Sequence, residues 1–160
     1  MHVCTYICIM KLEDAIKTSK FNNAKHKATL NLMYSVYWLK THMNSTLKAF
    51  DITAEQYNVL RILRGKHPDS QCVKEIGSRM LEKSSNVPRI IDRLVAKKLA
   101  KRSTSKEDKR ETLISITEKG LALLEEATKV ADKQSEEIFG LTNEEAETLN
   151  ALLEKMRKTD

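Results

Sequence analysis

The composition of this 160-residue chain excludes a disordered protein and a membrane-spanning one: 41% of its residues are apolar, yet no apolar run approaches the roughly 18 residues that a bilayer span requires. The chain contains only 4 Gly and 2 Pro, and this composition favours helices. Its 3 Cys make no disulfide framework, its 4 His stand apart from other metal ligands, and its net charge of +6 becomes informative only where it is concentrated.

The chain begins with a segment unlike the rest. We expect residues 1–23 to form an N-terminal extension, in which residues 1–9 are either a loose tail or precede a natural start at Met10. From Ala24 to Phe50, apolar residues recur at helical spacing. This pattern predicts a long helix that is broken or bent near the polar residues 41–46.

Capping signals mark the next two helices. Thr53 and Gln56 have the spacing of a capping box, and Ile52 and Tyr57 occupy the two positions of a hydrophobic staple. A helix is therefore predicted over residues 54–64. Cys72 precedes a shorter predicted helix over residues 73–80.

Pro88 indicates where the following helix starts. Proline lacks a backbone N–H and fits only the first turn of a helix, which places the N-cap at Ser84 or Ser85. The predicted helix buries its apolar side and leaves three polar residues on another face: Asn86, Arg89 and Arg93. Two short helices joined by a short turn predict a helix-turn-helix.

A two-stranded wing is predicted next, because LAKRST and ETLISIT bracket the polar turn SKEDKR. The net positive charge is concentrated in the segment that comprises the preceding predicted helix and the start of this wing. Residues 83–110 contain ten Lys and Arg against three acidic residues, whereas the rest of the chain sums to −1. Such a segment is expected to form a surface that meets polyphosphate.

Two helices follow the wing. Thr117 caps one over residues 118–135, and Thr142 with Glu145 has the spacing of a capping box for the last. Apolar residues recur at helical spacing in both.

From about Leu30 to the C-terminus, the chain resembles the MarR family of bacterial transcription regulators. The resemblance rests on the segments ITAEQYNVLRIL, KSSNVPRIIDRL and EDKRETLISITEKG. The last is similar to the family's wing signature through Asp108, Arg110, Ile116, Thr117 and Gly120. The resemblance implies a mostly α fold with a small β-hairpin wing. A winged helix-turn-helix DNA-binding lobe would span residues 51–117, and a helical dimerisation region would comprise residues 24–50 and 118–160.

Two residues depart from the family's pattern. Lys98 stands where the family usually has glycine, so either a left-handed helix end there is unfavourable for it or the helix ends in a different geometry. Pro88 stands where Thr or Ser is common, which removes a hydroxyl group that would contact DNA. The sequence preference is therefore left open, while the DNA-binding class is not.

The predicted helix is expected to read the major groove. Asn86 suits adenine and Arg89 suits guanine, or both residues contact phosphate only. Arg93 either contacts DNA or forms an ion pair with a neighbour such as Asp92 or Glu82.

The wing is expected to insert Arg110 into the minor groove, with Asp108 orienting its guanidinium. The alternative is a charged turn that is merely solvated. The full predicted DNA-binding set is Ser84, Ser85, Asn86, Pro88, Arg89, Arg93, Lys106, Asp108, Lys109 and Arg110.

The resemblance also implies a regulatory signal, either a small aromatic or phenolic ligand or an oxidant. Tyr34, Tyr37, Trp38 and His42 follow helical spacing, so they either line a ligand pocket or belong to the core. Cys72, at a predicted helix N-terminus, is either a redox sensor or a small buried residue.

The sequence thus predicts a cytoplasmic, homodimeric transcription regulator, a repressor by preference, that binds a pseudo-palindromic double-stranded operator without a metal or other cofactor. Two copies are expected because one helix contacts too few bases and phosphates. The alternative function is a winged-helix module that binds protein and not DNA, which would be expected to carry an acidic or apolar wing. No nucleophile–base pair or phosphate loop predicts an enzyme.

Overall fold

The computed structural model describes residues 10–83, 86–105 and 108–157, and the chain divides into two compact units. One unit spans Lys20–Ala131, and the other combines residues before it with residues after it. Within the described ranges, no helix is long and apolar enough to cross a bilayer.

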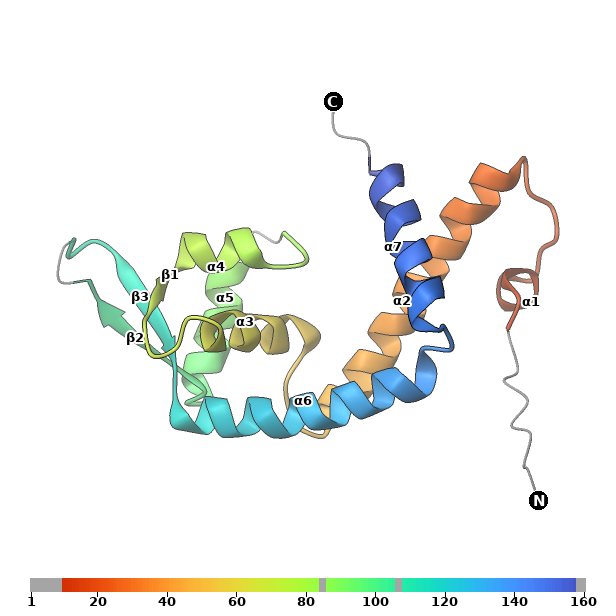
Figure 1. Ribbon diagram of the computed structural model, residues 1–160. Coiled ribbons are helices and arrows are strands. Elements are labelled where there is room, and N and C mark those ends of the chain that lie inside the picture. The colour runs from red at the N-terminus through yellow and green to blue at the C-terminus, as the bar shows by residue number, and fades with distance from the viewer. Residues whose placement is uncertain (1–9, 84–85, 106–107, 158–160) are drawn as a thin grey trace, which may run out of the picture. The chain divides into compact units, whose positions relative to one another are not determined.

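The unit Lys20–Ala131 contains the helix-turn-helix and the wing (Figure 1). Its elements are α2 (Ala24–Lys48), α3 (Ala54–Arg64), β1 (Gln71–Cys72), α4 (Val73–Arg79), α5 (Val87–Ala96), β2 (Ala100–Thr104), β3 (Thr112–Ile116) and most of α6 (Glu118–Ile138). Helices α4 and α5 form the helix-turn-helix, and strands β2 and β3 form the wing. The predicted fold class, mostly α with a small β-hairpin wing, is confirmed.

The core of this unit lies where α3, α4, α5 and the sheet meet. Leu60, Ile76, Ile91, Leu94 and Ile114 are each 0% exposed and come from four different elements. Complete burial of such a side chain stabilises a fold by about 1.5–3 kcal/mol. The core therefore holds the recognition helix α5 against both its neighbouring helices and the wing.

The sheet has three antiparallel strands in the order β1-β3-β2. Strand β1 was not predicted, because two residues carry no detectable alternation. In the register of β2 and β3, Ala100 lies opposite Ile116 and Arg102 lies opposite Ile114. Directly opposite residues share one face of a sheet, so Arg102 points to the face that carries buried Ile114.

Caps set the ends of the helices as predicted. The Gln56 N–H donates to Thr53 Oγ1 at 3.3 Å, and the Thr53 N–H donates to Gln56 Oε1 at 3.1 Å, which completes the capping box of α3. The Gly120 N–H donates to Thr117 Oγ1 at 3.0 Å at the start of α6. A Cβ at Gly120 would lie 2.1 Å from the carbonyl oxygen of Leu99. Only glycine allows α6 to begin this close to the end of the recognition helix.

Helix α2 runs unbroken from Ala24 to Lys48, so the predicted break near residues 41–46 is wrong. The hydroxyl groups of that polar stretch bond within the helix. Thr41 donates to the Tyr37 carbonyl at 2.9 Å, and Thr46 donates to the His42 carbonyl at 3.1 Å. Threonine side chains that return to the previous turn do not interrupt the backbone ladder.

The second unit contains α1 (Leu12–Ile16), the last turns of α6 and α7 (Asn143–Met156). The predicted capping box of α7 is present: the Thr142 N–H donates to Glu145 Oε2 at 2.8 Å and the Glu145 N–H donates to Thr142 Oγ1 at 3.3 Å. Helix α6 ends at Ile138, three residues later than predicted. The assignment of residues 24–50 and 118–160 to dimerisation stays a prediction.

Candidate nucleic-acid interface

The recognition helix α5 starts later than predicted. Asn86 is its N-cap and Val87 its first residue, so the predicted N-cap at Ser84 or Ser85 is wrong. Both serines lie outside the described residues. Pro88 sits in the first turn, as expected from its missing N–H. The side chain of Asn86 is therefore at the tip of the helix, where it is exposed.

The side of α5 away from the core carries the predicted readers. Val87, Ile91 and Leu94 are buried, whereas Pro88, Arg89 and Arg93 are exposed. This division follows from the helical period, which places residues three or four apart on one side. The exposed cations are available to a ligand as long as the surrounding acids do not bind them.

Arg93 does not form the ion pair that was considered for it. Asp92 pairs instead with Arg102 at 2.5 Å, and Glu82 pairs with Lys40 at 2.7 Å. Within the described part of the chain, neither acid reaches Arg93. The ion pair is therefore wrong for these two neighbours, and a contact between Arg93 and DNA stays a prediction.

Arg93 and Asn86 lie on the flank of α5 that faces the start of α3. Together with Ile90, Thr53, Glu55 and Gln56, they line a cavity of about 220 Å³. The Thr53 hydroxyl bonds to the Glu55 carboxylate, and with the nearby charge of Lys40 it holds the pKa of Glu55 below its usual value. The carboxylate of Glu55 and the guanidinium of Arg93 therefore line the same cavity.

The recognition helix ends in a left-handed residue. Lys98 has φ 61°, its N–H donates to the Val95 carbonyl at 2.9 Å, and the Leu99 N–H donates to the Leu94 carbonyl at 2.9 Å. These two bonds define a Schellman motif, in which glycine is the usual residue. The expectation that Lys98 would occupy an unfavourable conformation is confirmed.

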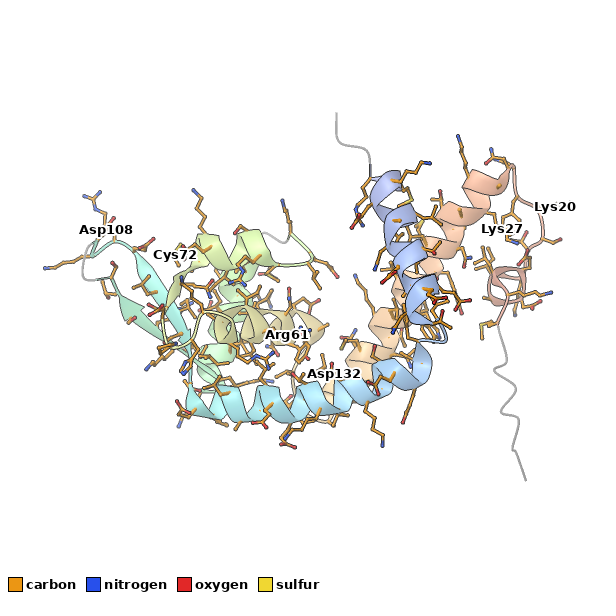
Figure 2. The ribbon with its side chains drawn as sticks, viewed as in Figure 1. Lys20, Lys27, Arg61, Cys72, Asp108 and Asp132 are labelled. Atoms are coloured by element: carbon orange, nitrogen blue, oxygen red, sulfur yellow. The ribbon has the colours of Figure 1, made fainter. Side chains whose placement is uncertain are left out.

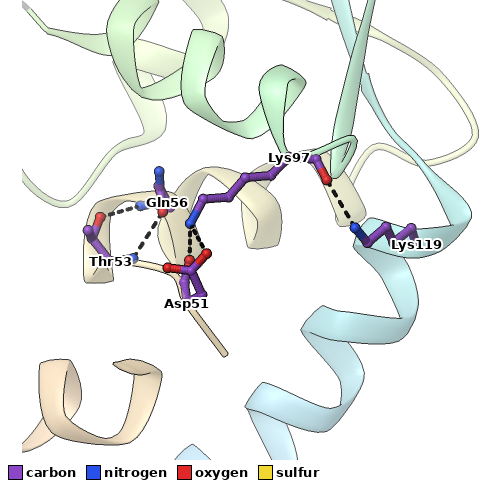
Figure 3. Close-up of polar contacts among 5 residues, drawn as sticks. All are labelled: Asp51, Thr53, Gln56, Lys97 and Lys119. Carbon is purple, nitrogen blue, oxygen red and sulfur yellow. Dashed lines mark hydrogen bonds and ion pairs between the residues drawn. The ribbon is translucent and has the colours of Figure 1, made fainter. Parts of the chain in front are cut away.

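Two lysines connect this helix end to its neighbours (Figure 3). Lys97 Nζ forms an ion pair with the Asp51 carboxylate at 2.9 Å and also donates to the Asp51 carbonyl. Lys119 Nζ donates to the Lys97 carbonyl at 3.2 Å. From the sequence, Lys97 is expected only to add to the charge of the basic segment. Because Lys97 pairs with Asp51 inside the lobe, the positive charge that faces outward is smaller than the ten Lys and Arg of residues 83–110 suggest.

The turn of the wing is organised by Asp108, which lies at its tip (Figure 2). The carboxylate accepts the backbone N–H of Arg110 at 2.9 Å, and the Asp108 N–H donates to Ser105 Oγ at 3.3 Å. Among the residues described, no ion pair joins Asp108 to the Arg110 guanidinium, so the predicted orientation of that group by Asp108 is wrong. The acid shapes the backbone of the turn instead.

The cations of the wing point to solvent. Lys109 and Arg110 are exposed, whereas the placement of Lys106 lies outside the described residues. A short Asx-type turn presents side chains that follow it in a defined direction. The described part of the wing turn thus offers two exposed cations, in the same lobe as the recognition helix.

The aromatic stripe of α2 does not belong to the hydrophobic core. The Tyr34 and Tyr37 rings lie 6.3 Å apart, the Trp38 and His42 rings lie 4.5 Å apart, and Tyr37 is 65% exposed. None of the four is among the buried core residues. The core alternative is wrong for this chain, and a role in ligand binding stays a prediction.

Cys72 is a free thiol at the N-cap of α4 (Figure 2). Its N–H donates to Glu75 Oε2 at 3.0 Å. The side chain is half-buried and borders a polar cavity of about 580 Å³. The alternative of a fully buried cysteine is therefore wrong, and a redox role stays a prediction.

Comparison with known proteins places the fold in one family. The family model of the SarA/Rot transcriptional regulators matches residues 41–127, which is more than half of the chain. The multiple antibiotic resistance protein MarR of Escherichia coli K12 is 33% identical over 121 residues, which cover 71% of this chain and 79% of that protein.

Two solved structures are similar over most of their length. The Staphylococcus aureus MepR–DNA complex has a TM-score of 0.70 at 29% identity, covering 81% of this chain and 94% of that one. The structure of Bordetella bronchiseptica BpsR, concerned with the regulation of its DNA binding by 6-hydroxynicotinic acid, has a TM-score of 0.76 at 25% identity and covers 88% and 100%. The chain therefore belongs to the MarR family of winged helix-turn-helix proteins, which are DNA-binding transcription regulators and not enzymes.

Proposed function

We propose that this regulator acts as a homodimer that binds a pseudo-palindromic, double-stranded operator in a sequence-specific manner. The observation that carries the proposal is the exposed side of α5, where Arg89 and Arg93 stand opposite the buried core face of that helix, together with the exposed cations Lys109 and Arg110 of the wing turn. A helix fits the major groove, and a wing reaches the groove beside it.

The roles of the individual residues follow from their chemistry. At the start of α5, Asn86 pairs with adenine and Arg89 with guanine, which are their geometrically matched bases. Arg93 contacts the sugar-phosphate backbone, and Arg110 enters the minor groove, whose negative potential favours arginine. The accompanying contacts come from Ser84, Ser85, Pro88, Lys106 and Lys109, whereas Asp108 serves the backbone of the wing turn.

The dimer is supported by apolar side chains that each unit leaves exposed. On α2, Met33 is 64% and Tyr37 is 65% exposed, and on α7, Leu152 is 59% and Met156 is 56% exposed. Large apolar side chains that stay exposed on helices indicate a surface for association. A two-fold dimer would present two recognition helices to two half-sites.

Repression is the regulatory outcome we propose, because a dimer that covers two turns of a promoter competes with RNA polymerase for the same DNA. A small aromatic ligand is the proposed signal, with Tyr34, Tyr37, Trp38 and His42 as its binding residues. The BpsR example supports this class of signal, since the DNA binding of BpsR is regulated by 6-hydroxynicotinic acid. Oxidation of Cys72 is the alternative signal.

Selection from a library of random duplexes tests the proposal. The purified protein should enrich an inverted repeat whose half-site centres lie about 34–36 Å apart along the duplex, or a multiple of that distance. Enrichment of a single half-site would contradict the dimeric mode. Recovery of no preferred duplex would contradict sequence-specific binding altogether.

A further inference from the structure

One residue of the wing strand bonds directly to the recognition helix. Arg102 Nη2 in β2 lies 2.5 Å from Asp92 Oδ1 in α5. Neither residue belongs to the predicted DNA-binding set. The bond joins the two parts of the lobe that are proposed to enter adjacent grooves.

The register of the sheet explains why Arg102 reaches the helix. Arg102 lies opposite Ile114, which is 0% exposed, so its side chain leaves the face of the wing on which the core is built. The next residue toward the N-terminus, Lys101, points to the other face because side chains alternate along a strand. The same strand thus offers one arginine that meets α5 and one exposed lysine that does not.

The charge of Asp92 would oppose DNA binding if it were left alone. Asp92 is the one acidic residue of α5, between Arg89 and Arg93 on its exposed side. A free carboxylate on a surface that meets phosphate is repelled by it. The guanidinium of Arg102 neutralises this carboxylate and is itself withheld from phosphate by the same bond.

The pair adds little to the stability of the fold. The Arg102 and Asp92 side chains are 41% and 57% exposed. Ion pairs that are this exposed to solvent contribute little to the free energy of folding. What the bond restricts is the position of the wing relative to α5. A small displacement of the wing relative to α5 matters for DNA binding, because the two elements must enter adjacent grooves of one duplex at the same time.

We infer that Asp92 and Arg102 are positioning residues for sequence discrimination. The pair holds the wing and the recognition helix in one relative position, and it keeps Arg102 from contacting phosphate at any sequence. The inference rests on the proposed function. Loss of the pair therefore weakens binding to the selected operator while adding affinity for unrelated DNA.

Fluorescence polarisation with two probes tests the inference: the duplex selected by the wild-type protein and a scrambled duplex of equal length and composition. Asp92→Asn frees Arg102 with almost no change of shape, and we expect the ratio of the two affinities to fall about tenfold. The slope of log K against log salt on the scrambled duplex should become steeper by about 1, since one more cation meets phosphate.

A double-mutant cycle separates positioning from an ordinary contact. In the Asp92→Asn background, Arg102→Gln should return the salt slope to the wild-type value and remove the added affinity for unrelated DNA, while binding to the selected operator stays as weak as in Asp92→Asn, because coupled residues do not act additively. Lys101→Gln, which removes a charge from the other face of the same strand, should leave discrimination unchanged. Arg102→Lys retains the ion pair and should keep discrimination within about threefold of wild type.

The outcomes are distinct. Unchanged discrimination in Asp92→Asn, or an Arg102→Gln effect that is the same with and without Asp92, would overturn the inference while the proposed function stands. Failure of the wild-type protein to bind either duplex would overturn both. Thermal unfolding of each variant verifies its folding, and Arg102→Lys and Asp92→Asn give the decisive comparison if Arg102→Gln does not fold.

Discussion

At the scale of single residues, Lys98 shows how the lobe tolerates a side chain in an unfavourable conformation. Its φ of 61° lies in the left-handed region, which costs residues with a Cβ about 1–2 kcal/mol. The conformation is retained because Thr117, which precedes α6, bonds to the end of the recognition helix. Its hydroxyl donates to the Lys98 carbonyl at 2.8 Å, and its N–H donates to the Leu99 carbonyl at 3.1 Å.

Replacement of Lys98 by glycine should therefore stabilise the protein. We expect Lys98→Gly to raise the free energy of unfolding by about 0.5–1 kcal/mol, which is the relief of strain reduced by the greater freedom of glycine in the unfolded chain. Urea denaturation followed by circular dichroism measures the change. Lys98→Ala removes the same side chain but keeps the strain, so a Lys98→Gly variant no more stable than Lys98→Ala would refute the argument.

Glu55 should make the stability of the lobe depend on acid. Its pKa is lowered in the folded state by the Thr53 hydrogen bond and by Lys40, so its ionised form stabilises the fold above the unfolded-state pKa. This contribution disappears as the pH falls through the folded-state pKa. Glu55→Gln should lose a few tenths of a kcal/mol near neutral pH, because the group is largely solvated, and progressively less as the pH falls below the unfolded-state pKa. Urea denaturation of both proteins at neutral pH and at acid pH measures the difference. An equal loss of unfolding free energy at the two pH values would show that the charge of Glu55 is not the cause.

At the scale of secondary-structure elements, α5 and the wing should make separable contributions to DNA binding. In the proposed complex, helix α5 offers an arginine and an asparagine to base edges, whereas the wing offers cations to a groove that distinguishes bases poorly. The lobe would then divide specificity and affinity between the two elements.

Alanine variants should separate these contributions. Arg110→Ala should weaken binding to all duplexes to a similar extent, whereas Arg89→Ala should cost about 1–3 kcal/mol at one base pair and relax the preference there. Asn86→Ala should do the same at another base pair. Titration of duplexes with single base changes measures both effects. An Arg110→Ala variant that binds as tightly as wild type would show that the wing does not touch DNA.

Much at this scale could be predicted from sequence, because the signals are local. The capping residues Thr53, Thr117 and Thr142 mark their helices, and Pro88 marks the first turn of α5. The start of α5 was placed too early because two serines are as good N-caps as Asn86. The break in α2 was predicted from polar residues whose hydroxyl groups bond to their own helix.

The partners of charged side chains could not be predicted in this way. Lys97 meets Asp51 and Arg102 meets Asp92 across separations of 46 and 10 residues, which depend on how the elements pack. For Arg102 a signal existed: it stands two residues after buried Ala100 and therefore on the same face of its strand. The hydrogen bond from the Arg110 N–H to the Asp108 carboxylate could not be predicted, because the guanidinium of the same arginine is an equally near partner in the sequence.

At the scale of the whole molecule, the proposed binding to two half-sites requires two copies of the chain. Leu152 on α7 is 59% exposed, so its replacement by glutamate should leave the fold of one chain intact. We expect Leu152→Glu to weaken dimerisation by at least tenfold, since a charge must then be desolvated in an apolar contact. Analytical ultracentrifugation measures the equilibrium.

The matched control for this variant is Ala151→Glu, which adds the same charge to the other side of α7. It should remain as dimeric as wild type. Equal dimerisation of both variants would place the association surface elsewhere in the chain.

The salt dependence of DNA binding tests the central claim most directly, because neutralisation of phosphates releases counterions whereas most protein contacts do not. With the selected duplex, the affinity of the wild-type protein should fall by about a thousandfold between roughly 50 and 200 mM salt, as expected for several phosphate contacts in each half-site. An affinity that hardly changes over this range would contradict the claim that the recognition helix and the wing grip a DNA duplex.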